Sequence, residues 1–263
     1  MSTLPLRGRR ALVCGASRGI GQAAAIALAE AGASVVALGR NADTLFKNTL
    51  KRLALYDTSA HTMIEVDQND LVRLSQDVGV LASQSPFHIW VNNTGGPKGG
   101  PLAEASVEAL EAAFHQHLSA AQTILQAVLP GMRAAGYGRI INVISTSVKQ
   151  PIPGLGVSNT IRGAMASWAK TLAGELGPDG ITVNNVLPGF TATGRLDEII
   201  TAKANAQGKA QGDIAQAMKA TVPAGRFADP RETGAAIAFL ASPSAAYING
   251  INLPVDGGRT KSL

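Results

Sequence analysis

Three polar residues, Ser145, Ser158 and Arg162, have types and spacing that could hold and polarise a ligand. Ser158 follows Ser145 by 13 positions, and Arg162 follows Ser158 by four, which places the last two one turn apart on the same face of a helix. A serine hydroxyl can orient a ligand by hydrogen bonding but is a poor acid, and an arginine stays protonated. We expect this set to bind a polar or anionic group without relaying protons well.

Two other residues are candidates for proton transfer. His117 is the first because imidazole titrates near neutral pH, and Lys149, between the two serines, is the second. A histidine packed in a helix and a solvated loop lysine would explain the same residues, so both roles stay open. His115 points to a different helix face, where we expect a structural role. No Gly-x-Ser-x-Gly elbow surrounds Ser145, which argues against a hydrolase.

A glycine-rich stretch near the N-terminus could hold a dinucleotide. It follows an apolar run and opens directly into a helical pattern. Glycines at such a turn let the backbone approach a pyrophosphate, which the positive end of the helix then stabilises. A tight turn without a ligand is the simpler alternative. The predicted phosphate site comprises Gly15, Ser17, Arg18, Gly19, Ile20 and Gly21.

Short apolar runs alternate with longer helical patterns and predict the elements that position these residues. Alternation of this kind implies right-handed crossovers and an α/β fold, a doubly wound parallel sheet of about seven strands with helices on both faces. Ligands then bind at the carboxyl ends of the strands. The runs interpreted as strands buried on both faces are Arg10–Gly15, Ser34–Leu38, Thr62–Val66, Ile89–Asn93, Arg139–Ile144, Ile181–Leu187 and Ile251–Val255.

Composition favours a single globular domain. The chain has 263 residues, 46% of them hydrophobic, with no linker or charge run that divides it. Cys14 is its one cysteine, no metal-ligand cluster is present, and neither a signal peptide nor a membrane span is recognisable, so we expect a cytoplasmic protein. The net charge of +5 is scattered and only 4% of residues are aromatic, which argues against a nucleic-acid partner. The polar, glycine-dotted segment 194–226 is interpreted as a mobile lid, although a solvated excursion would also explain it.

The spacing Gly-x-x-x-Gly-x-Gly resembles that of the short-chain dehydrogenase/reductase family, and the similarity is closest to 3-oxoacyl-carrier-protein reductases. It implies one Rossmann-type domain over residues 1–263, and a homotetramer built partly on the long helices. Asp67 would contact adenine, and Asn93, Gly95, Pro188, Gly189 and Thr193 would line the cofactor. Further motifs agree in order and spacing over nearly the whole chain: Asp67, Asn92-Asn93-Thr94-Gly95, Pro188-Gly189 with Thr193, and Asp256-Gly257-Gly258.

The resemblance also implies roles for the polar set. In the family a tyrosine protonates the nascent alkoxide, a lysine lowers the pKa of that tyrosine, a serine orients the carbonyl and an asparagine completes a water relay. Ser145 matches the serine, whereas Ser158 stands at the tyrosine, Arg162 at the lysine and His117 at the asparagine. Only one of the four family residues is retained.

Two more departures concern the cofactor. Arg40 stands where an NAD-binding protein places an acidic residue, and with Arg18 it could grip a 2′-phosphate, so NADP(H) is favoured over NAD(H). Cys14 replaces the usual threonine. A thiol is a poor hydrogen-bond donor, so we expect a weaker tie between the glycine loop and the Asn92 segment.

Two functions fit these observations. The first is an NADP(H)-dependent oxidoreductase, with a substituted proton donor, for a small-molecule or acyl-carrier-linked carbonyl or alcohol. The second is a nucleotide-binding protein, a sensor or scaffold subunit, with little or no turnover. Retained Ser145 and Pro188-Gly189 favour the first, and the changes at Ser158 and Arg162 favour the second.

Overall fold

Seven parallel strands form one sheet in the order β3-β2-β1-β4-β5-β6-β7. The computed structural model describes residues 4–56 and 61–262. Every strand boundary lies within one residue of the predicted run, and the doubly wound fold is confirmed. The strands are β1 (Arg10–Cys14), β2 (Ser34–Gly39), β3 (Thr62–Glu65), β4 (Ile89–Asn92), β5 (Gly138–Val143), β6 (Ile181–Pro188) and β7 (Asn252–Val255).

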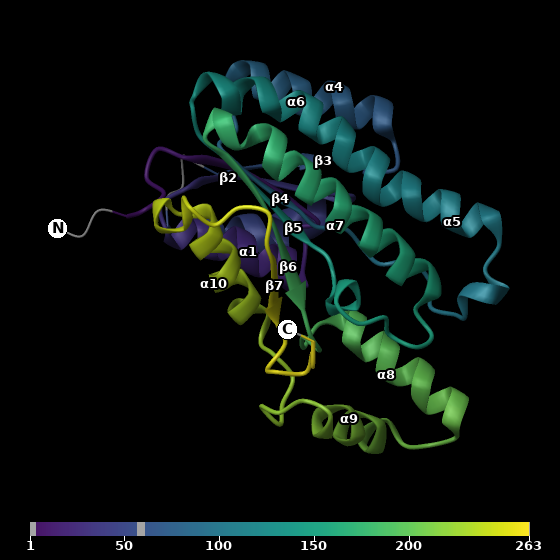
Figure 1. Cartoon of the computed structure of the whole chain (residues 1–263). Helices are drawn as coiled ribbons and strands as arrows, with labels where there is room; N and C mark the ends of the chain where they lie inside the picture. Colours follow the sequence, from purple (N-terminus) through teal and green to yellow (C-terminus); the bar gives the residue numbers. More distant parts are fainter. Residues whose placement is uncertain (1–3, 57–60, 263) are drawn as a thin grey trace.

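Helices cover both faces of the sheet (Figure 1). On one face lie α4 (Leu71–Gln84), α5 (Val107–Phe114), α6 (Ala120–Ala134) and α7 (Gly156–Leu176), and on the other α1 (Gly19–Glu30) and α10 (Pro230–Ala241). Beyond the carboxyl ends of the strands project α8 (Gly194–Gln207) and α9 (Gln211–Ala220). Two short helices, α2 (Ala42–Leu45) and α3 (Lys51–Leu53), follow β2.

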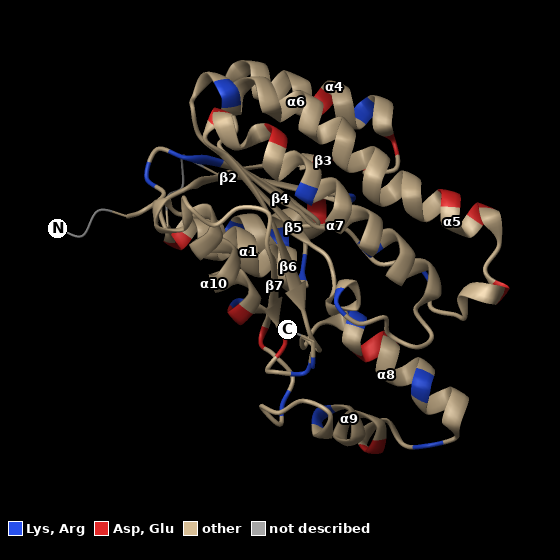
Figure 2. Cartoon of the chain, in the orientation of Figure 1, with Lys and Arg blue, Asp and Glu red and all other residues tan. Residues whose placement is uncertain are grey.

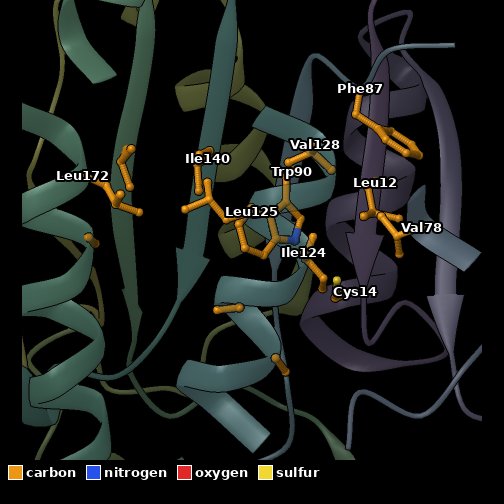
Figure 3. Close-up of a cluster of buried hydrophobic side chains, with 14 of the residues drawn as sticks. Leu12, Cys14, Val78, Phe87, Trp90, Ile124, Leu125, Val128, Ile140 and Leu172 are labelled. Atoms are coloured by element: carbon orange, nitrogen blue, oxygen red, sulfur yellow. The ribbon is translucent and has the colours of Figure 1, made fainter. Parts of the chain in front are cut away.

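Each face of the sheet carries its own apolar core, because neighbouring strand residues point to opposite sides. On the α4–α7 side, Leu12, Trp90 and Ile140 pack against helix residues such as Ile124 (Figure 3). The indole of Trp90 is fully buried and meets that of Trp168 edge to face, with ring centroids 6.4 Å apart. The sheet is therefore held from both sides as a rigid platform.

The prediction that all seven strands are buried on both faces is wrong for two of them. β3 and β7 contain only exposed or half-buried residues, whereas the five strands between them are almost entirely buried. Both are edge strands, so each lacks a neighbour on one side, and their apolar composition alone did not reveal that position.

Charged side chains of both signs are distributed over the helices and loops (Figure 2). This mixture agrees with the scattered charge expected from the sequence. Within the part of the chain that the structure describes, no helix combines the length and the apolar character that crossing a membrane requires.

A row of asparagine amides crosses four neighbouring strands of the sheet, from the last residue of β4 to the first residue of β7. Asn92 donates to Asn142 (2.9 Å), Asn142 donates to Asn185 (3.0 Å), and Asn185 donates to Asn252 (2.8 Å). These residues are direct partners in the strand register. The first three are buried, so each amide depends on its neighbour for hydrogen bonds. The row links β4, β5, β6 and β7 at one level.

Replacing the middle of this asparagine row should destabilise the fold. In Asn142→Leu the buried donor of Asn92 and acceptor of Asn185 lose their partner, which we expect to cost about 2–4 kcal/mol of unfolding free energy. Urea denaturation at a fixed protein concentration measures this. The comparison variant is Asn252→Leu on the edge strand, which leaves only the donor of Asn185 without its partner and should cost about half as much. An equal loss of unfolding free energy in the two variants would contradict the idea that the asparagine row stabilises the buried sheet.

Candidate active site

A cleft of about 510 Å³ opens at the carboxyl ends of the strands, as the topology predicts. It is lined by the glycine loop after β1, the residues that follow β2 to β6, the start of α7 and the first turns of α8. Of the residues predicted to bind a cofactor, all but Gly21 line it: Gly15, Ser17, Arg18, Gly19, Ile20, Arg40, Asp67, Asn93, Gly95, Pro188, Gly189 and Thr193.

Gly21 serves packing beneath the loop. A Cβ atom there would lie 2.2 Å from the carbonyl oxygen of Gly15, so no other residue lets α1 start this close to the loop. Gly15 itself has a φ of +60°, which favours glycine. The loop thus forms the tight cradle with exposed amides that a pyrophosphate requires.

The loop is tied to the β4 segment by Asn93. Its Nδ2 donates to the carbonyl oxygen of Cys14 at 3.2 Å and lies 3.4 Å from that of Gly15. The weaker tie expected from Cys14 is therefore offset by an amide that uses the backbone and not the side chain at position 14. Burial raises the pKa of the Cys14 thiol to about 12, so the thiol stays neutral in the core.

The end of the cleft that lies beside the glycine loop and β2 carries two exposed arginines. Arg18 and Arg40 are exposed, line the cleft, and have no carboxylate within ion-pair distance among the residues described. Asp67 lies at the same end, where its Oδ1 accepts from the backbone N–H of Asn69 at 2.9 Å. Both arginines are free to contact a phosphate.

Ser145 and Ser158 line the cleft, Ser145 just beyond β5 and Ser158 in the first turn of α7. The Oγ of Ser145 accepts a hydrogen bond from the backbone N–H of Ser147 at 3.1 Å. Because this contact uses an oxygen lone pair, the hydroxyl proton of Ser145 remains available to a carbonyl in the cleft. That arrangement suits a residue that orients and polarises a substrate.

Arg162 lies on the same side of the cleft, one turn after Ser158, as the four-residue spacing predicts. It is 7% exposed, and its guanidinium donates to the carbonyl oxygens of Val143 (3.1 Å) and Thr94 (3.5 Å). No described carboxylate forms an ion pair with it. Burial lowers the pKa of Arg162 to about 10, so the group is still charged at neutral pH.

The expectation that His117 titrates near neutral pH is wrong. The side chain is 2% exposed and does not line the cleft. Burial lowers the pKa of His117 to about 3, the charge of Arg162 acts in the same direction, and a hydrogen bond to the carbonyl of Gly95 only partly opposes them. At neutral pH the ring is neutral, so it holds no imidazolium proton to donate.

Lys149, the second candidate, and His115, for which a structural role is expected, also lie apart from the cleft. Lys149 follows a short helical turn after Ser145 and does not line the cleft. His115 is exposed, and its Nε2 lies 2.9 Å from the carbonyl oxygen of Asn69, which confirms that it faces away from His117. Neither is placed to exchange protons with a ligand in the cleft.

Gln116 was missed by the sequence analysis. It lines the cleft, and its Nε2 donates to the Oγ1 of Thr94 at 3.2 Å. A π-helical turn runs from His115 to Ser119, so the side chains of this stretch do not follow regular helical spacing. Thr94, which replaces the alanine of the family motif, was the signal that could have indicated a polar partner.

The segment 194–226 is helical and not an irregular loop. Leu196 and Ile200 of α8 pack with Ile214 and Met218 of α9 in a small apolar cluster of their own. At the mouth of the cleft, Arg195 pairs with Glu198 (3.0 Å) and donates to the carbonyl oxygen of Pro97 at 3.2 Å. These contacts join the start of the segment to the loop after β4.

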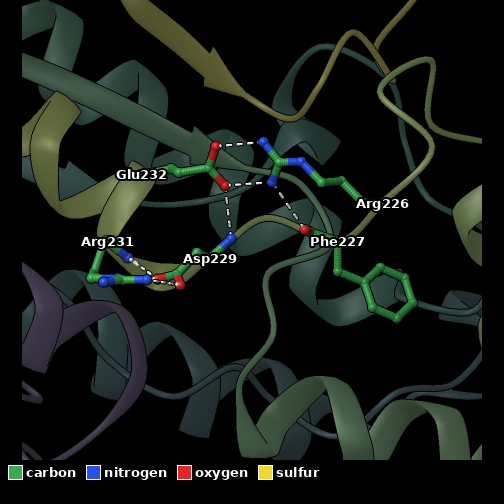
Figure 4. Close-up of polar contacts among 5 residues, drawn as sticks. All are labelled: Arg226, Phe227, Asp229, Arg231 and Glu232. Atoms are coloured by element: carbon green, nitrogen blue, oxygen red, sulfur yellow. Dashed lines mark hydrogen bonds and ion pairs between the residues drawn. The ribbon is translucent and has the colours of Figure 1, made fainter.

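The end of this segment is anchored by ion pairs (Figure 4). Arg226 binds both carboxylate oxygens of Glu232 at 2.7 Å, and Glu232 also accepts from the backbone N–H of Asp229 at 2.8 Å. Asp229 caps α10 and pairs with Arg231. The hydrogen bonds with Arg226 hold the pKa of Glu232 at about 2, so this anchor stays ionised at neutral pH.

Comparison with known proteins gives consistent matches along the chain. A family model described as enoyl-(acyl carrier protein) reductase matches residues 15–260. The gluconate 5-dehydrogenase of Gluconobacter oxydans is 31% identical over 98% of this chain and 97% of its own. A 3-oxoacyl-[acyl-carrier-protein] reductase of Vibrio cholerae is 36% identical over 96% and 98%.

Solved structures agree with these matches. The L-sorbose reductase of Gluconobacter frateurii, solved with NADPH and L-sorbose, superimposes with a TM-score of 0.92 at 30% identity, covering 99% of this chain and 100% of its own. YwfH, an NADPH-dependent reductase involved in bacilysin biosynthesis, gives 0.92 at 28% identity, covering 97% and 99%. By its fold, its glycine loop and these matches, the chain belongs to the short-chain dehydrogenase/reductase family.

Proposed function

We propose that the protein is an NADP(H)-dependent oxidoreductase for a carbonyl or alcohol substrate of the 3-oxoacyl type, working with Ser158 and Arg162 in place of tyrosine and lysine. The observation that carries the proposal is one cleft with a phosphate cradle at one end and Ser145 and Arg162 at the other. NADP-type cofactors supply the hydride when bound. The close approach of Gly21 to Gly15 and the free arginines Arg18 and Arg40 fit such a group.

Ser145, Arg162 and Ser158, at the end of the cleft opposite the phosphate cradle, have separate roles in holding and polarising the substrate. Ser145 donates a hydrogen bond to the substrate oxygen and polarises the carbonyl, while the fixed charge of Arg162 stabilises negative charge that develops nearby. Ser158 orients the ligand. None of these groups is an efficient acid, so we assign the proton that reaches the substrate oxygen to water. The missing acid lowers the rate by roughly 10²–10⁴-fold, and positioning supplies what remains.

A second candidate is a nucleotide-binding protein without turnover. It is favoured by the aliphatic hydroxyl at Ser158 and by the neutral, buried ring of His117, which leave the cleft without an evident proton donor. Under this alternative, the chain binds the cofactor and reduces nothing. Steady-state oxidation of NADPH in the presence of carbonyl compounds separates the two.

Two further features support parts of the proposal. The first turns of α8 line the cleft, and Arg195 ties them to the carbonyl oxygen of Pro97 in the loop after β4, which supports a substrate lid that begins at residue 194. Exposed apolar residues, Val107 and Phe114 on α5 and Tyr247 near the C-terminal end, offer contact surface for the proposed homotetramer.

The cofactor preference should depend on Arg40. We expect NADPH to bind more tightly than NADH, and Arg40→Ala to weaken NADPH binding about 10-fold or more while leaving NADH binding nearly unchanged, because hydrogen bonds to charged groups contribute about 1.5–3 kcal/mol. Fluorescence titration measures both affinities. Arg73→Ala, a surface arginine of α4 paired with Asp77, is the control. An NADH preference that persists in Arg40→Ala would oppose the assignment.

Restoring the family pair should raise the rate. The double variant Ser158→Tyr/Arg162→Lys returns a phenol whose pKa a lysine can lower, and we expect reduction of a simple 3-oxoacyl substrate to accelerate by roughly 10²–10⁴-fold. Steady-state NADPH oxidation is the measurement. Ser158→Phe/Arg162→Lys keeps the ring without the hydroxyl and should stay slow. If both double variants fold, bind NADPH and show the same rate, the missing phenol is not what limits turnover.

His117 should affect acid stability and not the pH profile of the rate. Its folded pKa of about 3 lies below the value near 6.5 of an unfolded histidine, so the unfolded chain gains a proton that the folded chain refuses. Stability therefore falls as the pH drops from about 6.5 toward 3, by roughly 2 kcal/mol at about pH 5 for this group. Denaturation curves should show a smaller acid loss for His117→Asn than for the wild type. A rate inflection near neutrality that vanishes in this variant would show instead that His117 does titrate there.

A further inference from the structure

Arg162 is a buried charge that no carboxylate of residues 4–56 or 61–262 neutralises. Its two hydrogen bonds go to backbone carbonyls, and its burial already lowers its pKa, which shows that the surroundings disfavour the charged form. A buried cation without a counter-ion is costly in a folded protein. A ligand in the cleft that carries a negative charge would offset the free-energy cost of burying this cation.

The guanidinium has donors to spare for such a ligand. Of its five N–H groups, one Nη1–H contacts Val143 and one Nη2–H contacts Thr94, the latter at a long 3.5 Å. The side chain also lines the cleft, and none of its nitrogens is both fully buried and unpaired. The guanidinium of a residue that lines the cleft presents its donors in a rigid fork, which matches the two oxygens of a carboxylate.

The cofactor is not the source of this negative charge. Its phosphates belong to the glycine loop and, through Arg18 and Arg40, to the opposite end of the cleft, while a ribose hydroxyl is neutral and leaves the charge of Arg162 in place. The substrate is the remaining ligand of the reaction end. Its neighbours there, Ser145 and Ser158, are neutral hydroxyls and add no repulsion for an anion.

We propose that Arg162 binds a carboxylate of the substrate, so that the substrate is an oxo acid, or the hydroxy acid formed from it, with the carboxylate a few bonds from the reacting carbonyl. The spacing follows from β5: Arg162 contacts the carbonyl of Val143, and Ser145 lies two residues further, on the order of 7 Å along an extended chain. A 2-oxo or 3-oxo acid spans that gap with its carboxylate on Arg162 and its carbonyl near Ser145.

This inference rests on the proposed oxidoreductase function and adds no new bond change. The carbonyl carbon gains the hydride, the carbonyl oxygen gains a proton from water, and the reduced nicotinamide is oxidised. The carboxylate is unchanged and acts only in recognition. Arg162→Gln should therefore remove discrimination between an acid and its neutral analogue, whereas a residue that merely supports the fold would affect both analogues alike.

The test compares matched acid and amide pairs: acetoacetate with acetoacetamide, and pyruvate with pyruvamide. We measure kcat/KM with NADPH, and binding of each compound to the protein–NADP⁺ complex by calorimetry. The wild type should prefer at least one acid over its amide by roughly 10–100-fold, as expected for charge-assisted hydrogen bonds. Arg162→Gln should bring this ratio near one, Arg162→Lys should keep part of it as a point charge, and the surface control Arg73→Gln should keep all of it.

The outcomes separate the inference from the function on which it rests. Reduction of amides as efficient as that of acids in the wild type, or an acid preference that survives in Arg162→Gln, overturns the inference and leaves the oxidoreductase intact. Weaker NADPH binding in Arg162→Gln with an unchanged acid-to-amide ratio overturns it too, because the guanidinium then serves the ribose.

Acid binding that depends on Arg162 without any NADPH oxidation supports the carboxylate site and refutes the proposed function. Failure of both acids to bind the wild-type complex overturns the carboxylate site. If Arg162→Gln does not fold, Arg162→Lys decides: a reduced acid-to-amide ratio supports the inference, and a ratio equal to that of the wild type overturns it.

Discussion

The cleft depends on the alignment of β4, β5 and β6 at their carboxyl ends, and the asparagine row holds that alignment. Asn92, Asn142 and Asn185 are register partners whose amides bond to one another in the buried sheet. A slip of one residue would turn these amides to the opposite face and leave them unpaired. Asn93 follows the first of them directly, and Ser145 comes three residues after the second. The hydrogen bonds that set the register therefore also set where the glycine-loop tie and the polarising serine lie.

A fixed charge at the reaction end sets the chemistry that the cleft can perform. A lysine and tyrosine pair exchanges protons, whereas the guanidinium of Arg162 keeps its proton and offers only hydrogen bonds and charge. Ser145, with its oxygen already accepting from Ser147, offers one hydroxyl proton as a donor. These groups offer hydrogen-bond donors and one fixed positive charge but no efficient acid, which is the basis of the proposed anionic ligand. Hydride transfer needs positioning above all, and these residues can provide it.

Sequence reasoning predicted the sheet and most of the cleft because both follow from local patterns. Strand boundaries came from apolar runs, and the spacing of Ser158 and Arg162 placed both on the cleft side of α7. What it could not supply were properties that arise from packing. The exposure of β3 and β7 depends on the order of strands in space, and the π-helical turn at His115–Ser119 is where Gln116 lines the cleft while His117 is buried. The pKa of His117 depends on burial and on a charge 45 residues away in the chain.

Arg162 and His117 constrain each other, which limits how proton transfer could be restored at this site. The charge of Arg162 lowers the pKa of His117, so two cations in this buried region disfavour one another. A carboxylate bound to Arg162 would cancel that repulsion. It would not cancel desolvation, however, which is the larger cause of the low pKa. In the structure, His117 forms a hydrogen bond with the carbonyl of Gly95, which holds the neutral ring next to the loop that Asn93 and Thr94 begin.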